Sequence, residues 1–107
     1  MKEYIKFFWN HKSIEDPIVI LYEIDTDNER LVTRSIDVFL DRSTNNIEDF
    51  YAEVLEIVPI PTIEELNNGI WGNGIHACLI DKKEFEDTWN SKSYNETITW
   101  LGGINYE

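Results

Sequence analysis

Carboxylates with no basic residues among them are the side chains of this sequence that bear most directly on its chemistry. No Lys or Arg occurs between Ser43 and Ile80. The acidic residues of that stretch are Glu48, Asp49, Glu53, Glu56, Glu64 and Glu65. A surface of one sign repels phosphate-rich partners and attracts basic proteins. We therefore predict that these residues form an acidic face that binds a basic protein partner.

The charge of the whole chain has the same sign. Twenty-one Asp and Glu against nine Lys and Arg give a formal net charge of −12. Such a charge disfavours binding to nucleic acid or to an anionic membrane surface. It also keeps a small protein soluble whatever its function, so composition alone leaves solubility as an equal alternative to partner binding.

One aromatic residue lies inside the acidic stretch, on a glycine-rich segment. Trp71 is flanked by Gly69, Gly72 and Gly74. Interface hot spots favour Trp, so Trp71 is a candidate apolar anchor for the partner. An equal alternative is that its ring closes one end of the sheet. The segment lacks the Lys-Ser/Thr ending of a phosphate-binding loop.

The histidines and the single cysteine do not form a complete catalytic or metal site. His76 lies two residues before Cys78, and His11 is remote in sequence. A zinc site needs three or four protein ligands, and a nucleophile needs a base and an orienting group. We predict no catalytic, metal-binding or cofactor-binding residues. A small enzyme that uses His11, His76 and carboxylates is kept as an alternative.

Length and cysteine content indicate a single intracellular domain. The chain of 107 residues is predicted to form one domain, 1–107. One cysteine cannot form an internal disulfide, which favours a reducing compartment. The N-terminal residues lack the apolar run of a signal peptide, and no stretch approaches the roughly 20 apolar residues of a membrane span. We predict a cytoplasmic location.

Three strands are predicted in the first 40 residues, at 3–11, 18–24 and 31–40. In the first segment, aromatic and β-branched residues alternate with period two. The second segment is apolar at nearly every position, which indicates a central strand. Short polar links join the three, so we predict an antiparallel meander. Phe7, Trp9 and Phe39 are predicted to be core residues.

Residues 46–58 allow two interpretations. Apolar side chains recur there at helical spacing, and Asn46 could cap the helix. The aromatic and β-branched content also permits one or two short strands. Periodicity alone favours the helix.

Two capping patterns predict short helices in the second half of the chain. Thr62 and Glu65 have the spacing of a capping box, and a second helix begins at Asp81. A strand is predicted at 75–80 between them, and residues 93–107 form a last strand or a packed tail. The predicted fold class is α+β, an antiparallel sheet flanked by short helices.

Four segments resemble the motifs of a family of small uncharacterised bacterial domains. The resembling residues are 4–11 with Pro17 and 21–23, then 34–41, 59–67 and 85–89. They occur in order over roughly residues 4–89. The resemblance implies an antiparallel sheet flanked by short helices, with strands rather than a helix in 46–58. It carries over no catalytic residue.

The same resemblance suggests a function. Members of this family are often encoded near polymorphic toxins, and some look like immunity proteins of contact-dependent growth inhibition systems. We therefore expect a protein that binds and neutralises a cognate toxin, with a basic nuclease as the expected partner. A generic adaptor subunit is the other alternative. Oligomeric state is not predicted.

Overall fold

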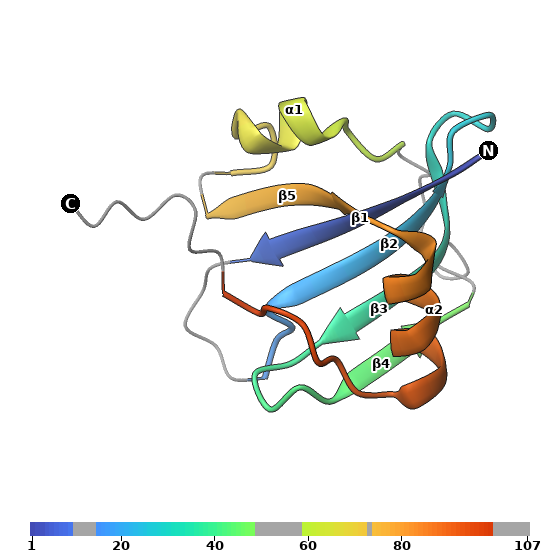
Figure 1. Cartoon of the computed structure of the whole chain (residues 1–107). Coiled ribbons are helices and arrows are strands. Elements are labelled where there is room, and N and C mark those ends of the chain that lie inside the picture. Colours follow the sequence, from blue (N-terminus) through green and yellow to red (C-terminus); the bar gives the residue numbers. More distant parts are fainter. Residues whose placement is uncertain (10–14, 49–58, 73, 100–107) are drawn as a thin grey trace.

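The computed structural model describes residues 1–9, 15–48, 59–72 and 74–99, which form a five-stranded antiparallel sheet and two short helices (Figure 1). The strands are β1 (Lys2–Trp9), β2 (Val19–Asp25), β3 (Leu31–Val38), β4 (Thr44–Ile47) and β5 (Ile75–Ile80). The helices are α1 (Ile63–Asn67) and α2 (Lys82–Ser91). The strand order β4-β3-β2-β1-β5 confirms the α+β class and the N-terminal meander.

The predicted third strand is two residues too long. β3 ends at Val38 because the chain then turns: the Phe39 N–H donates to the Ser43 carbonyl (3.0 Å), and the Arg42 N–H donates to the Phe39 carbonyl (2.8 Å). Arg42 has a positive φ of 71°. Leu40 lies on this turn and is 60% exposed.

The helix that periodicity favoured from residue 46 is wrong at its start. Asn46 lies in β4, directly opposite Ile36 of β3, so it does not cap a helix. Its side-chain amide instead donates to the main-chain carbonyl of Trp89 (2.9 Å). Residues 49–58, on which the rest of that prediction falls, lie outside the described residues.

One face of the sheet is covered by α2 and the segment that follows it (Figure 1). Asp81 begins the helix by accepting from the Glu84 N–H (2.8 Å). Phe85 then packs against Tyr4, with ring centres 5.4 Å apart. After the helix, Ser93 bridges to Ser43 and Tyr94 is fully buried. Of the two alternatives left open for residues 93–107, the described residues 93–99 show this one bridge and no regular strand; 100–107 lie outside the described part.

The other face is covered by α1, which lies near β5 (Figure 1). The predicted capping box is confirmed: the Glu65 N–H donates to Thr62 Oγ1 (3.2 Å), and the Thr62 N–H donates to Glu65 Oε1 (2.9 Å). Leu66 is fully buried against the sheet. Asn67 makes two hydrogen bonds to the main chain of Ala77 in β5, so α1 is joined to an edge strand.

Because both faces are covered, the inner strands are buried on both sides. β2 is the middle strand of the sheet, as its apolar sequence predicted. Phe7 is buried, but Trp9 is 37% exposed, so its prediction as core is wrong. Trp9 is the last residue of β1 and pairs with the first residue of β5, so it lies at one end of the sheet.

No helix among the described residues is long and apolar enough to cross a membrane.

Candidate functional site

The residues predicted to bind a partner do not form one continuous face in the described structure. Glu64, Glu65 and Trp71 gather on α1 and the turn after it, on the β5 side of the sheet. Glu48 follows β4, at the opposite edge. The other three predicted residues, Asp49, Glu53 and Glu56, lie outside the described residues.

The first group forms what we call the α1 surface: Glu64, Glu65, Ile70 and Trp71. Both carboxylates are exposed, Ile70 is 56% exposed and Trp71 is 40% exposed. The Trp71 ring centre lies 5.9 Å from that of Phe7. One side of the indole therefore packs on the sheet while another part remains accessible. Gly72, with φ of +123°, permits the turn.

Arg30 is the basic residue that fastens the chain entering α1. Its guanidinium donates to the main-chain carbonyls of Ile60 (2.9 Å) and Pro61 (3.1 Å). Its third contact is an ion pair with Glu3 (2.9 Å). The donors of this cation are thus directed at the chain before α1, and the carboxylates of Glu64 and Glu65 remain exposed.

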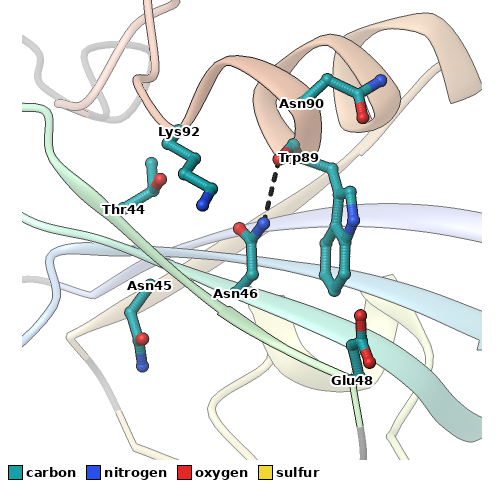
Figure 2. Close-up of a pocket in the computed structure, with 7 residues that line it drawn as sticks. All are labelled: Thr44, Asn45, Asn46, Glu48, Trp89, Asn90 and Lys92. Atoms are coloured by element: carbon teal, nitrogen blue, oxygen red, sulfur yellow. Dashed lines mark hydrogen bonds between the residues drawn. The ribbon is translucent and has the colours of Figure 1, made fainter.

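A polar cleft lies at the opposite edge, between β4 and the end of α2 (Figure 2). We call it the β4–α2 cleft; its volume is about 730 Å³. Its lining residues are Thr44, Asn45, Asn46, Glu48, Trp89, Asn90 and Lys92. The hydrogen bond from Asn46 to the Trp89 carbonyl crosses from strand to helix. Thr44 Oγ1 and Asn46 Oδ1 are buried and have no hydrogen-bond partner among the described residues.

Sequence reasoning missed this cleft apart from Glu48. The run Thr44-Asn45-Asn46 is a weak signal, because three consecutive polar side chains are unusual for a strand with one buried face. Nothing in the sequence indicates that these residues meet the end of α2, more than 40 positions later.

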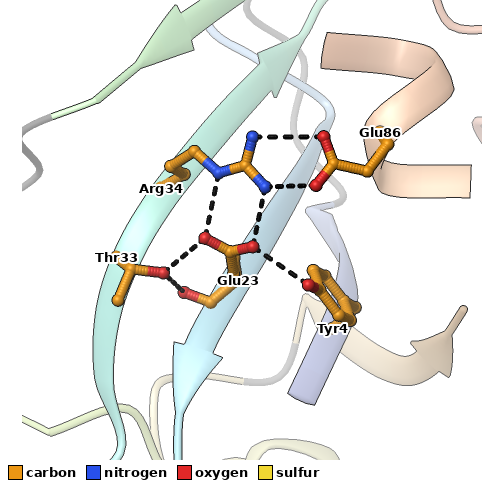
Figure 3. Close-up of polar contacts among 5 residues, drawn as sticks. All are labelled: Tyr4, Glu23, Thr33, Arg34 and Glu86. Carbon is orange, nitrogen blue, oxygen red and sulfur yellow. Dashed lines mark hydrogen bonds and ion pairs between the residues drawn. The ribbon is translucent and has the colours of Figure 1, made fainter. Parts of the chain in front are cut away.

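A charged network joins α2 to three strands (Figure 3). Arg34 makes two hydrogen bonds to Glu23 (2.9 and 2.7 Å) and two to Glu86 (3.3 and 2.6 Å). Glu23 also accepts from the Tyr4 hydroxyl (3.0 Å) and from Thr33 Oγ1 (2.6 Å). The Arg34 guanidinium lies within 5 Å of the ring centres of both aromatic residues on α2, Phe85 and Trp89.

The electrostatics of the network indicate a structural role. Hydrogen bonds from Arg34 lower the pKa of Glu23 to about 2, and burial together with Glu23 raises the pKa of Tyr4 to about 12. A general acid or base works best with a pKa near the working pH. Glu23 stays ionised and Tyr4 stays protonated at neutral pH, so the two groups hold the helix rather than transfer protons.

A lysine is buried on the same face. Lys6 is 5% exposed, and its Nζ lies 4.7 Å from the Phe8 ring centre and 4.8 Å from that of Tyr94. Burial lowers the pKa of Lys6. The Tyr94 hydroxyl donates to Glu84 (2.5 Å), and burial raises its pKa. The amine is therefore enclosed by rings and shielded from solvent.

His76 and Cys78 lie two residues apart in β5 and share its α2 face. Cys78 packs against the core, and burial raises the pKa of its thiol, which reduces the fraction of reactive thiolate. Burial lowers the pKa of His76, whose ring lies 6.3 Å from that of Phe8. His11 lies outside the described residues. Within the described ranges, no three His, Cys, Asp or Glu side chains converge as metal ligands.

Comparison with known proteins identifies a family. A family model described as "Domain of unknown function (DUF6881)" matches residues 3–94. No curated protein and no solved structure matches the chain.

Proposed function

We propose that this chain, which belongs to the family described as a domain of unknown function (DUF6881), is an immunity protein that binds and neutralises a basic bacterial toxin. The expected toxin is a nuclease, and the expected place of action is the cytoplasm. The inhibitor acts by binding, without chemistry of its own. The observation that carries the proposal is the α1 surface, where exposed carboxylates adjoin two exposed apolar side chains.

Charge supports a basic partner. The net charge of −12 creates a field that accelerates encounter with a positive protein and weakens as salt is added. The nucleic-acid site of a nuclease is positively charged because it binds phosphates. Carboxylates on the α1 surface would pair with the same basic side chains and so compete with the substrate.

Apolar contacts supply the second half of the interaction. Trp71 is half-exposed, and its contact with Phe7 holds the ring in place before the partner arrives. A pre-positioned aromatic residue loses little conformational entropy on binding, and Trp is a frequent hot-spot residue. Ile70, immediately before it, extends the apolar area of the α1 surface.

The test is to co-express the chain with the product of the adjacent open reading frame and to measure complex formation at low and high salt. The parent should capture that protein, with affinity falling as salt rises. A Glu64→Gln/Glu65→Gln variant keeps the capping box, because Gln also serves at that position, and should associate about tenfold more slowly at low salt. Trp71→Ala should mainly increase the dissociation rate.

A matched control removes the same charge elsewhere. Asp41→Asn/Asp87→Asn changes two exposed acidic residues remote from α1 and should bind nearly as the parent does. The proposal is wrong if the neighbouring product is not captured. It is also wrong if the α1 variants bind as tightly as this control.

A further inference from the structure

The β4–α2 cleft contains hydrogen-bonding atoms that the described protein leaves unused (Figure 2). Asn46 Nδ2 donates to the Trp89 carbonyl (2.9 Å). This bond sets the orientation of the amide and leaves Oδ1 as an acceptor without a partner. Thr44 Oγ1 is also buried without a partner. A buried polar atom in that state costs roughly 1–3 kcal/mol, so a ligand that satisfies both atoms would bind favourably.

We propose that this cleft binds a guanidinium group, as carried by an arginine side chain of a partner. A guanidinium has five N–H donors and no acceptor, which matches two unpaired oxygens and the exposed carboxylate of Glu48. The end of α2 contributes further negative character, because helix C-termini favour cations. The net charge of −12 raises the local concentration of any cation.

The protein already binds one guanidinium in a similar setting. The guanidinium of Arg34 lies 4.8 Å from the ring centre of Trp89 and pairs with Glu86. Trp89 also lines the cleft. An indole beside a carboxylate is a good environment for a planar cation. Around Arg34 these groups are Trp89 and Glu86, and in the cleft they are Trp89 and Glu48.

Lys92 makes the proposal sharply testable. Its exposed side chain extends from the end of α2 toward Thr44 and Asn46 (Figure 2). A cationic ligand would be repelled by this ammonium or would have to displace it, whereas an anionic ligand would be attracted. Removal of the Lys92 charge should therefore strengthen binding of a guanidinium and weaken binding of an anion.

The experiment is an NMR titration of the ¹⁵N-labelled protein with N-acetyl-arginine amide. The citrulline analogue, which has the same shape without the charge, is the neutral control, and inorganic phosphate is the anionic one. Methylguanidinium tests whether a guanidinium group binds the cleft without the rest of the arginine residue, as a free guanidinium ligand would. We expect saturable shifts at Asn45, Asn46 and the Trp89 indole N–H with the arginine amide, and none there with citrulline amide or phosphate.

Three variants locate the site. Glu48→Gln should weaken binding about threefold, the size of one exposed ion pair. Lys92→Gln should strengthen it about twofold to threefold for the same reason. Glu64→Gln removes an equal charge at the opposite edge of the sheet and should leave the affinity unchanged.

The cleft shares no residue with the α1 surface. The cleft proposal can therefore fail while the proposed function holds, and the proposed function can fail while the cleft proposal holds. It is overturned if the arginine amide shifts no cleft resonance, or if citrulline amide shifts the same resonances equally. It is also overturned if Lys92→Gln weakens binding. Equal weakening by Glu48→Gln and Glu64→Gln would mean that only the overall charge attracts the probe.

Discussion

On the α2 face, side chains from three strands converge on one helix through an ionic network, whereas on the α1 face two side chains hold a helix of five residues and the chain before it through hydrogen bonds to the main chain. The network consists of Arg34, Glu23 and Glu86 with the hydroxyls of Tyr4 and Thr33. On the other face, Asn67 bonds to the main chain of Ala77, and Arg30 to the carbonyls before α1.

The two faces differ in what they bury and in what they leave exposed. The α2 face buries charge and therefore depends on every partner being present, because an unpaired buried charge is costly. The α1 face buries apolar side chains beneath a short helix and leaves Ile70 and Trp71 accessible. Both faces therefore stabilise the fold through buried apolar side chains, but the α2 face adds a charged network and the α1 face adds exposed apolar side chains.

The strongest test of this division is to remove the centre of the network. Arg34→Ala should lower the free energy of unfolding by about 3–5 kcal/mol, because it leaves the Glu23 carboxylate buried without a cation. Urea denaturation followed by circular dichroism measures the change. Arg34→Lys retains the charge but loses the paired geometry and should cost less. A loss below 1 kcal/mol for Arg34→Ala would show that the α2 face does not depend on the network.

Acid should weaken the α2 face selectively. The pKa of Glu23 is lowered from 4.5 to about 2 in the folded protein, so its ionised form stabilises the fold above the unfolded value. That contribution, about 3 kcal/mol, is lost as pH falls from about 4.5 to about 2. Denaturation midpoints measured across this range should fall steeply for the parent. Glu23→Gln should show a shallower slope; an identical slope would assign the acid sensitivity to other carboxylates.

On the α1 face, the corresponding contact is smaller. Asn67→Ala removes a hydrogen bond to each of the main-chain N–H (2.7 Å) and carbonyl (3.0 Å) of Ala77. We expect a loss of about 1–2 kcal/mol and faster hydrogen exchange at the Ala77 amide. Asn68→Ala, at the exposed neighbouring position, is the control and should leave that amide protected. A loss as large as that of Arg34→Ala would remove the distinction between the faces.

The smallest predicted effect is a gain. Lys92 ends α2 in the left-handed conformation with φ of 59°, which Gly adopts more readily. Lys92→Gly should therefore stabilise the protein by about 0.5–1 kcal/mol. Asn90→Gly, inside the same helix, should have the opposite sign. Thermal denaturation of the two variants beside the parent decides the matter; destabilisation by Lys92→Gly would mean that its side chain contributes to the α2 face.

Local signals in the sequence were sufficient for much of the fold. The alternation in β1 and the capping pattern of Thr62 and Glu65 involve residues within a few positions of one another, and both are confirmed. The helix prediction fails at Asn46 because the strand conformation of β4 depends on pairing with β3, and a four-residue strand with three polar residues has no periodicity of its own. The core prediction for Trp9 fails because alternation indicates the face of the sheet on which a side chain lies but not how far that face is covered.

The candidate sites were harder to predict for the same reason. Glu64, Glu65 and Trp71 lie close in sequence and come together on one surface, whereas Glu48 is carried to the other edge by the strand order. The ion pair of Arg34 with Glu86 joins residues 52 positions apart, and the Asn46 contact to Trp89 joins residues 43 apart. Sequence patterns report neighbours along the chain, so contacts of this separation need the three-dimensional structure.

The enclosure of Lys6 has a consequence for chemical labelling. Acylating reagents react with deprotonated amines that they can reach, and Lys6 is covered by the rings of Phe8 and Tyr94. In contrast, Lys2, Lys82 and Lys83 are exposed. Acylation of Lys6 would therefore follow the rate at which the segment that carries Tyr94 separates from the sheet. Mass spectrometry of one peptide could thus time the opening of the α2 face while the exposed lysines calibrate the reagent.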